Sequence, residues 1–358
     1  MDLAVHIGAI AMAFGLTIFV HEAGHFIAAR LSRMTVHEFS IGFGRPLLFW
    51  IRRGGTQYSF RFWPFLSYVR IAGMEPGEDD PNGFYRKSRA KQALVLGMGS
   101  TMNFLLAVAI FVFIGAVLGR PVASTSTVER VLRGTPAESV GLQPGDRLIG
   151  LDGDTGLSLA EIQKKIMESP DEPLSLDIDR DGALLSVPVT PRRETIQVLD
   201  EDDRVVDKVV GRVGIVFRQR VERLGIGASI VDGFRNTFLM IYLLTSHLFE
   251  LVQRWQAPAL IGPVGVVQTM YNEARVSWSA FLFTFAAVTV SIGFLNLLPV
   301  PPLDGSRLLI VGLEAIRRKP FDKRKEMWLH LVGYALILAL FFVLTYKDIL
   351  RGIGLRGQ

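Results

Sequence analysis

Residues 21–25 combine two histidines and a glutamate in the spacing H-E-x-x-H. On a helix, side chains four residues apart lie on one face, so the imidazoles of His21 and His25 can bind the same Zn²⁺. Glu22 could then take a proton from a water molecule on the metal, as in metal-assisted hydrolysis. Because these ionisable residues end an apolar run, where they are costly beside lipid, the pattern favours a functional site over polar residues that merely end a helix.

A catalytic zinc needs a third protein ligand and an open position for water. The chain contains no Cys, so this ligand must be a His or a carboxylate. Asp304 is the best candidate, because it follows the proline-rich break in residues 296–305, N-L-L-P-V-P-P-L-D-G. Irregular backbone at membrane depth is tolerated only where it lines a protein cavity. The sequence therefore predicts one zinc ion bound by His21, His25 and Asp304.

Long apolar runs must position these groups. Hydrophobic residues make up 49% of the 358 residues, and the mean hydropathy is +0.33, which is too apolar for an ordinary soluble enzyme. Residues 3–29, 93–119, 278–298 and 329–346 are nearly free of charge, and each is close to or above the roughly 20 residues of a crossing helix. A fifth run, 237–249, has 13 residues between charged flanks and fits an interfacial or packed helix better. We therefore expect a polytopic α-helical membrane protein with about four spans.

Loop charge predicts the orientation of the spans. Residues 30–91 carry 11 Lys and Arg against 5 Asp and Glu, and residues 299–327 carry 7 against 4, so both loops should be cytoplasmic. Residues 120–273 carry 17 basic and 22 acidic residues and should face the opposite side together with both termini. The first and third spans then end at the same leaflet, which brings His25 near Asp304. These loops explain the net charge of +5 better than nucleic-acid binding does.

Between the second and third spans, residues 126–191 alternate short β-branched runs with turns rich in Gly and Asp, which predicts a small β-rich domain. The string T-P-A…G-L-Q-P-G-D-R-L-I…L-D-G in residues 135–153 resembles a PDZ domain. PDZ domains bind extended peptides or chain ends by strand addition, and residues 211–215, G-R-V-G-I, look like a carboxylate-binding loop. A rigid spacer or size filter that binds no ligand is an equally good interpretation.

The whole chain resembles the bacterial site-2 proteases, intramembrane zinc metalloproteases of the RseP type in family M50, with one PDZ domain. The shared features occur in order: H-E-x-x-H, a basic loop with G-M-E-P-G at 73–77, a span with G-x-x-x-N at 99–103, the PDZ insert, and N-x-x-P-x-P-x-x-D-G at 296–305. The resemblance implies that His21, His25 and Asp304 are zinc ligands and that Glu22 is the general base.

The resemblance also implies substrate contacts. Asn296, Pro299 and Pro301 would help to position the substrate. Residues 54–71 look like a membrane-embedded β-hairpin, whose edge, with Tyr68 and Val69, would pair with an unwound substrate. Asn103 could donate a hydrogen bond to the substrate or its oxyanion, or it could bond a neighbouring helix. Both roles fit an Asn in a span equally well.

The function implied is that of a bacterial inner-membrane endopeptidase with one zinc per chain. It would cleave the span of a single-span membrane protein near the cytoplasmic leaflet, as in regulated intramembrane proteolysis of anti-sigma factors or signal-peptide remnants. The expected partners are this substrate, the lipid bilayer and a peptide or chain end at the PDZ domain, but no nucleic acid. The expected domains are a protease core in 1–119 and 276–358, a PDZ domain in 120–220 and an amphipathic connector in 221–275.

Two other classes of function remain open. A noncatalytic membrane adaptor could bind partner chain ends through the PDZ domain, although an intact Glu22 argues against it. A zinc transporter would need acids or histidines along its path, and residues 93–119 contain none.

Overall fold

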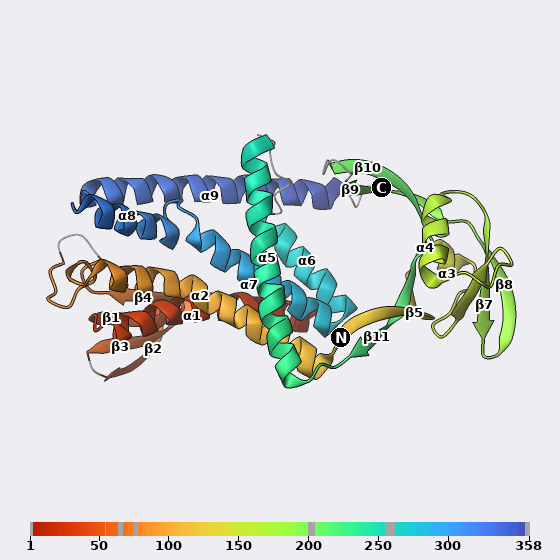
Figure 1. Ribbon diagram of the computed structural model, residues 1–358, viewed down its shortest axis with the longest axis horizontal. Helices are drawn as coiled ribbons and strands as arrows, with labels where there is room; N and C mark the ends of the chain where they lie inside the picture. Colours follow the sequence, from red (N-terminus) through yellow and green to blue (C-terminus); the bar gives the residue numbers. More distant parts are fainter. Residues whose placement is uncertain are drawn as a thin grey trace. The chain divides into compact units, whose positions relative to one another are not determined.

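A computed structural model describes residues 3–53, 55–63, 67–74, 78–199, 205–254 and 262–354 (Figure 1). The chain divides into two compact units. The helical unit comprises Met1–Leu118 and Leu224–Gln358, and the inserted unit is Gly119–Arg223. Residues 224–275 of the segment 221–275, predicted as an amphipathic helical connector, belong to the helical unit.

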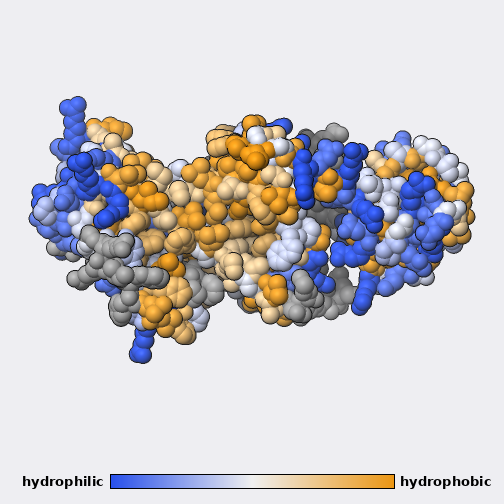
Figure 2. Space-filling model, turned by 90° about the horizontal axis from the view of Figure 1, so that it is seen from below, coloured by the Kyte–Doolittle hydropathy of each residue, from blue (hydrophilic) through white to orange (hydrophobic). Residues whose placement is uncertain are grey.

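Four helices among the described residues are long and apolar enough to cross a membrane. They are α1 (Leu3–Leu31), α2 (Arg89–Phe113) with its π-helical continuation η2 (Ile114–Leu118), α7 (Trp278–Leu297) and α9 (Lys323–Gly354). These helices coincide with the four predicted runs, and α9 extends beyond its run at both ends. Figure 2 shows hydrophobic surface over the middle of the helical unit, which suits helices that face lipid.

The helices α1, α2 and α7 form the core around the candidate site. Ala13, Ala107 and Ala286 are buried between them, and the hydroxyls of Thr17 and Thr289 lie 3.1 Å apart across α1 and α7. A methyl group on Gly24 would lie 2.5 Å from the backbone oxygen of Met98. The lack of a side chain at Gly24 thus lets α1 approach the backbone of α2 closely, as small residues do in membrane helix pairs.

Three other helices complete this unit: α5 (Ile226–Arg254), α6 (Pro263–Val276) and α8 (Asp304–Arg317). The run 237–249 lies within the longer α5, which crosses the four candidate spans steeply in Figure 1. Asp348 of α9 accepts hydrogen bonds from the amides of Gly262 and Gly265, at 3.2 and 2.7 Å, at the start of α6. A carboxylate at a helix N-terminus is electrostatically favourable, so this contact joins α9 to α6.

The segment between α1 and α2 forms a four-stranded sheet, in which the two strands of the predicted hairpin, residues 54–71, are not paired with each other. It contains β1 (Val36–Ile41), β2 (Phe43–Arg53), β3 (Thr56–Trp63), β4 (Tyr68–Ile71) and the short 3₁₀ helix η1 (Phe84–Arg86). The strand order is β2-β3-β1-β4, so β3 pairs with β2 and β1, whereas β4 pairs antiparallel with β1. Alternating aromatic residues located β3 in the sequence, but alternation within one strand does not identify its partners. Residues 54, 64–66 and 75–77 of the predicted loop features lie outside the described residues.

The inserted unit is β-rich, as the PDZ resemblance implies. Its five-stranded sheet has the order β11-β5-β6-β7-β8, and β9 and β10 form a separate antiparallel pair. Its elements are β5 (Arg120–Val131), α3 (Pro136–Ser139), β6 (Arg147–Leu151), α4 (Leu159–Glu168), β7 (Leu174–Arg180), β8 (Ala183–Val189), β9 (Arg192–Leu199), β10 (Val205–Arg212) and β11 (Ile215–Glu222). Ser158 and Glu161 form a capping box at the start of α4.

The core of the inserted unit lies between the sheet and α4, where Val128, Leu148, Leu176, Ile178 and Ile162 are almost fully buried. The predicted carboxylate-binding loop, 211–215, runs from the end of β10 to the start of β11. Gly214 in this turn has φ +85°, and an added methyl group would collide with Thr135. Only glycine fits that position without strain.

Candidate metal centre

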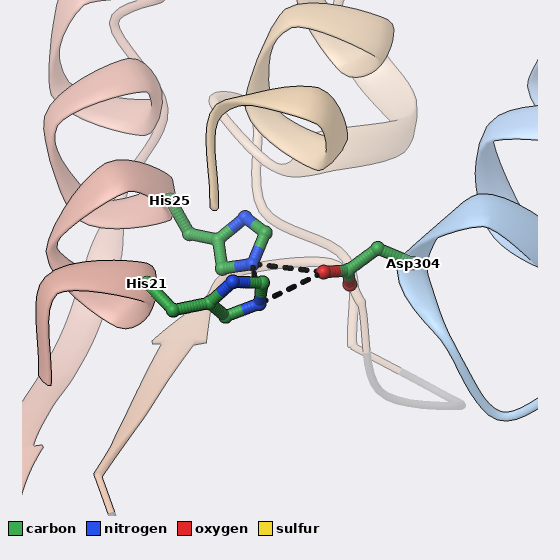
Figure 3. Close-up of side chains that lie close together, drawn as sticks. All are labelled: His21, His25 and Asp304. Carbon is green, nitrogen blue, oxygen red and sulfur yellow. Dashed lines mark hydrogen bonds and ion pairs between the residues drawn. The ribbon is translucent and has the colours of Figure 1, made fainter. Parts of the chain in front are cut away.

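The imidazoles of the H-E-x-x-H motif lie about one turn apart on the same face of α1 (Figure 3). His21 and His25 are both buried, and their Nε2 atoms lie 3.2 Å apart. Both rings face away from the axis of α1 toward the same point, as the four-residue spacing predicts.

Asp304 reaches this point from a distant part of the chain. It is the first residue of α8, which follows the irregular segment after α7. Its Oδ2 lies 3.1 Å from Nε2 of His21 and 3.1 Å from Nε2 of His25. The structure thus brings together the three residues that the sequence predicts as metal ligands, although His21 and Asp304 are 283 positions apart.

The spacing and chemistry of the three donor atoms fit zinc. Tetrahedral zinc with bonds of about 2.0–2.1 Å has neighbouring donor atoms about 3.3 Å apart. The observed separations of 3.1, 3.1 and 3.2 Å are close to that value. Two imidazoles and one carboxylate also match the donor sets of catalytic zinc sites, which leave one position for water.

The helix α2 holds the far side of both imidazoles. Nδ1 of His25 lies 2.7 Å from the backbone oxygen of Val95, which can only accept a hydrogen bond. This contact therefore protonates Nδ1 and leaves the lone pair of Nε2 for a metal. Nδ1 of His21 lies 3.4 Å from the side-chain amide of the fully buried Asn103, whose Oδ1 has no partner among the described residues.

Gly99 of α2 leaves the space that the two histidines occupy. A methyl group at this position would lie 2.5 Å from Nε2 of His25 and 2.7 Å from Cε1 of His21. Contacts this short do not occur between ordinary neighbours, so any side chain at 99 would displace the donor atoms. The sequence motif G-x-x-x-N contained the signal: Gly99 and Asn103 are four residues apart and share the face of α2 that contacts α1.

Glu22 contacts the edge strand of the sheet. Its Oε2 accepts a hydrogen bond of 3.1 Å from the backbone amide of Val69 on β4. Strand β4 is an edge of this sheet, and the hydrogen bond shows that the Val69 amide points toward Glu22 rather than toward β1. The sequence predicted a role for the amide of Val69 in pairing with substrate but not its bond with Glu22.

The second predicted edge residue, Tyr68, belongs to a polar network on the sheet. Glu38 accepts a hydrogen bond of 2.6 Å from Arg61 and one of 2.7 Å from Ser59. Burial opposes ionisation of Glu38, but the hydrogen bonds from Arg61, Ser59 and Tyr68 hold its pKa below the usual value. The Arg61 guanidinium also lies 5.5 Å from the centre of the Tyr68 ring. These contacts connect β4 to β1 and β3, so Tyr68 contributes to holding the edge strand.

The remaining predicted residues lie along the break that precedes Asp304. Asn296 is in the last turn of α7, half-buried, and its side chain has no hydrogen-bond partner among the described residues. Pro299 is exposed and Pro301 half-buried in the segment between α7 and α8. None of the three contributes a donor atom to the His21, His25 and Asp304 cluster.

Comparisons with known proteins cover both units of the chain. The profile described as "Peptidase family M50" matches residues 9–340. A putative zinc metalloprotease of Rhizobium meliloti is 31% identical over 93% of this chain and 93% of its own length. Zinc metalloprotease RasP of Oceanobacillus iheyensis is 30% identical, with 96% of this chain and 98% of that protein covered. Among solved structures, the PDZ domain of an SdrC-like protein from Listeria innocua matches 27% of this chain and 96% of that chain, with 15% identity and a TM-score of 0.20.

Proposed function

The chain belongs to peptidase family M50 and is a zinc metalloprotease of a bacterial membrane, and we propose that it cleaves the membrane-spanning segment of another protein. One observation carries this proposal: donor atoms of His21, His25 and Asp304 converge at the ends of apolar helices, beside Glu22. A protease with its site within such helices acts on a peptide bond at membrane depth. The noncatalytic adaptor is set aside, because the relatives are named as metalloproteases.

We propose His21, His25 and Asp304 as the residues that hold the zinc. When bound, zinc supplies Lewis acidity toward the peptide carbonyl and the attacking water. The backbone oxygen of Val95 keeps a proton on Nδ1 of His25, so that Nε2 of this ring faces the metal. Asn103 does the same for His21 if its amide is turned so that Oδ1 accepts from Nδ1, which also gives the orphaned oxygen a partner.

Glu22 is the proposed general base. Val69 donates to Oε2, which fixes the carboxylate and leaves Oε1 to accept a proton from the attacking water. As the C–N bond breaks, the same side chain delivers this proton to the nitrogen of the leaving amine, which restores the Glu22 carboxylate for the next cycle.

The edge of β4 is the proposed docking site for the substrate backbone. A helical substrate has its backbone groups occupied internally, so it must unwind before a peptide bond reaches the base. A strand added to β4 replaces the hydrogen bonds that the substrate loses. Asn296, whose amide has no partner in the described part of the chain, and the break at Pro299 and Pro301 are proposed to hold the opposite side of the substrate.

The orientation of the chain in the membrane follows from loop charge. The inserted unit and both termini are proposed to be extracytoplasmic, with the metal centre near the cytoplasmic leaflet. Strand β11 is an edge of the inserted sheet and follows the glycine turn at Gly214, which favours binding of a chain end there. Regulated proteolysis of a single-span protein is the proposed setting.

The proposed roles are tested by comparing wild type with Glu22→Gln in zinc content and in cleavage of a single-span substrate. Glu22→Gln keeps all three donor atoms and should retain about one zinc per chain while cleavage falls by roughly two or more orders of magnitude. His21→Ala should lose the zinc as well. Full zinc occupancy in His21→Ala, or normal cleavage by Glu22→Gln, would show that these roles are wrong.

A further inference from the structure

A cavity apart from the metal centre lies where α9 begins. Its volume is about 260 Å³, and its polar wall is formed by Tyr85, Arg307, Lys323, Glu326 and His330. These residues come from η1, α8 and α9, all within the helical unit. The reaction proposed above uses none of them.

The cavity has more positive than negative charge. Glu326 is the one carboxylate among the described residues that line it, and this carboxylate already accepts hydrogen bonds of 3.3 Å from the Tyr85 hydroxyl. Burial, reinforced by Glu326, raises the pKa of Tyr85 to about 12, so this hydroxyl stays protonated. The two fixed cations, Arg307 and Lys323, therefore face a single carboxylate that is already engaged.

Both cations have hydrogen-bond donors to spare. Nε of Arg307 lies 3.4 Å from Nε2 of His330 and 4.0 Å from Glu326, but its terminal nitrogens have no partner within the described ranges. Nζ of Lys323 lies 4.4 Å from the centre of the Tyr85 ring and makes no ion pair there. Lys323 also borders a neighbouring cavity with three acids. Glu78 pairs there with His37, Asp79 pairs with Arg86, and Asp80 accepts hydrogen bonds from Thr35 and Asn82. Among the described residues, Arg307 therefore has one distant ion-pair partner, Glu326, and Lys323 has none, so both cations can donate to a further anion.

An apolar wall continues the cavity along α9. Met327, Leu331 and Tyr334 line it, and their spacing of four and three residues sets them on one face of the helix. All three side chains are largely exposed, with exposed fractions of 48%, 56% and 63%. A group that fills this site must therefore be anionic at one end and apolar at the other.

The position of the cavity in the chain matches a lipid headgroup. Lys323 is the first residue of α9, a candidate span, so the cations lie at the membrane boundary. Loop charge puts this end of α9 on the cytoplasmic side, where the leaflet carries anionic lipid. We infer that the cavity binds the phosphate of an anionic phospholipid through Arg307 and Lys323, with an acyl chain along Leu331 and Tyr334.

The test measures binding of phosphatidylglycerol to the detergent-purified full chain by native mass spectrometry, with phosphatidylcholine and inorganic phosphate as comparison probes. Lys323→Gln removes one cation without breaking an ion pair to any described residue, and it should weaken phosphatidylglycerol binding about fivefold. The double variant with Arg307→Gln should weaken it by more than tenfold. Lys325→Gln is the matched control. Lys325 carries the same charge, lies two residues after Lys323, and has an exposed side chain that does not line the cavity.

Wild type should bind phosphatidylglycerol more tightly than phosphatidylcholine, and millimolar phosphate should not displace it. Equal loss of binding in Lys323→Gln and Lys325→Gln would reduce the effect to general surface charge and overturn the site. Displacement by inorganic phosphate would indicate a site for a soluble anion instead. Unchanged lipid binding in the double variant, with a raised KM for substrate, would assign the cavity to the substrate chain and refute the lipid proposal.

Discussion

Gly99 and Asn103 show how single residues of α2 shape a site whose donor atoms come from other helices. Gly99 leaves the volume that the two imidazoles fill, and Asn103 faces the outer nitrogen of His21. Neither residue is a metal ligand. Their effect is to decide where the ligand atoms lie, and metal affinity depends steeply on such outer contacts.

Gly99→Ala should abolish stoichiometric zinc binding, because the new methyl group would lie 2.5 Å from Nε2 of His25. Zinc content of the purified protein measures this directly. Gly97→Ala is the control on the same helix, since a methyl group there meets nothing within 4 Å. Zinc retained in Gly99→Ala at the wild-type level would contradict the observed packing of α2 against the metal centre.

Asn103→Leu should lower zinc affinity by about 10- to 100-fold, because it removes the acceptor for Nδ1 of His21. Asn103→Asp keeps an acceptor in the same position and should retain most of the affinity. Competition with a zinc chelator measures both variants without reference to cleavage. If Asn103→Leu bound zinc as tightly as wild type, Asn103 would be only a contact between helices.

At the scale of elements, the edge strand β4 connects the base to the substrate-binding sheet. The amide of Val69 is bonded to Glu22, and the same amide lies on the edge to which a substrate strand would add. The network of Glu38, Arg61 and Tyr68 holds β4 against β1 and β3. A shift of β4 would therefore also move the carboxylate of Glu22.

Val69→Pro should slow cleavage by about 10- to 100-fold with normal zinc content, because proline removes an amide that donates to a charged group. Val69→Ala keeps this amide and should cleave at nearly the wild-type rate.

Substrate spans with added Gly should be cut faster than Leu-rich ones, because Gly lowers the cost of leaving the helix by roughly 1 kcal/mol. Equal rates for all substrates and both variants would rule out strand addition while leaving the protease assignment intact.

At the scale of the whole molecule, orientation in the membrane decides which side each functional part can reach. Loop charge predicts an extracytoplasmic inserted unit and a cytoplasmic connection between α8 and α9. The chain has no Cys, so single cysteines can be introduced without background. Ser158 and Lys319 are both exposed and suit this purpose.

A cysteine at Ser158 should react with a membrane-impermeant maleimide in spheroplasts, whereas one at Lys319 should react only after permeabilisation. The difference should be nearly all-or-none, because the reagent does not cross the bilayer. The reversed pattern would overturn the orientation and, with it, the cytoplasmic position of the metal centre.

Much of this architecture could be predicted from local sequence. Four apolar runs predicted the four candidate spans, and the spacing of His21 and His25 predicted a shared helix face. The pairing of the strands could not be predicted in the same way. Strands β1 and β3 are parallel neighbours, and the sequence of neither strand identifies its partner. The hydrogen bond between Val69 and Glu22 joins residues 47 positions apart, and no local pattern in the sequence predicts it.

The sequence by itself determined the donor types, the helical spacing that puts two imidazoles on one face, and the apolar lengths that fit a bilayer. These properties are local, because periodicity and hydrophobicity act within one element. Only the tertiary structure decided that Gly99 opens the space for the histidines, that β4 is the strand beside Glu22, and that Arg307 and Lys323 share a cavity. Each of these depends on how separate elements pack, and packing contacts have no fixed spacing along the chain.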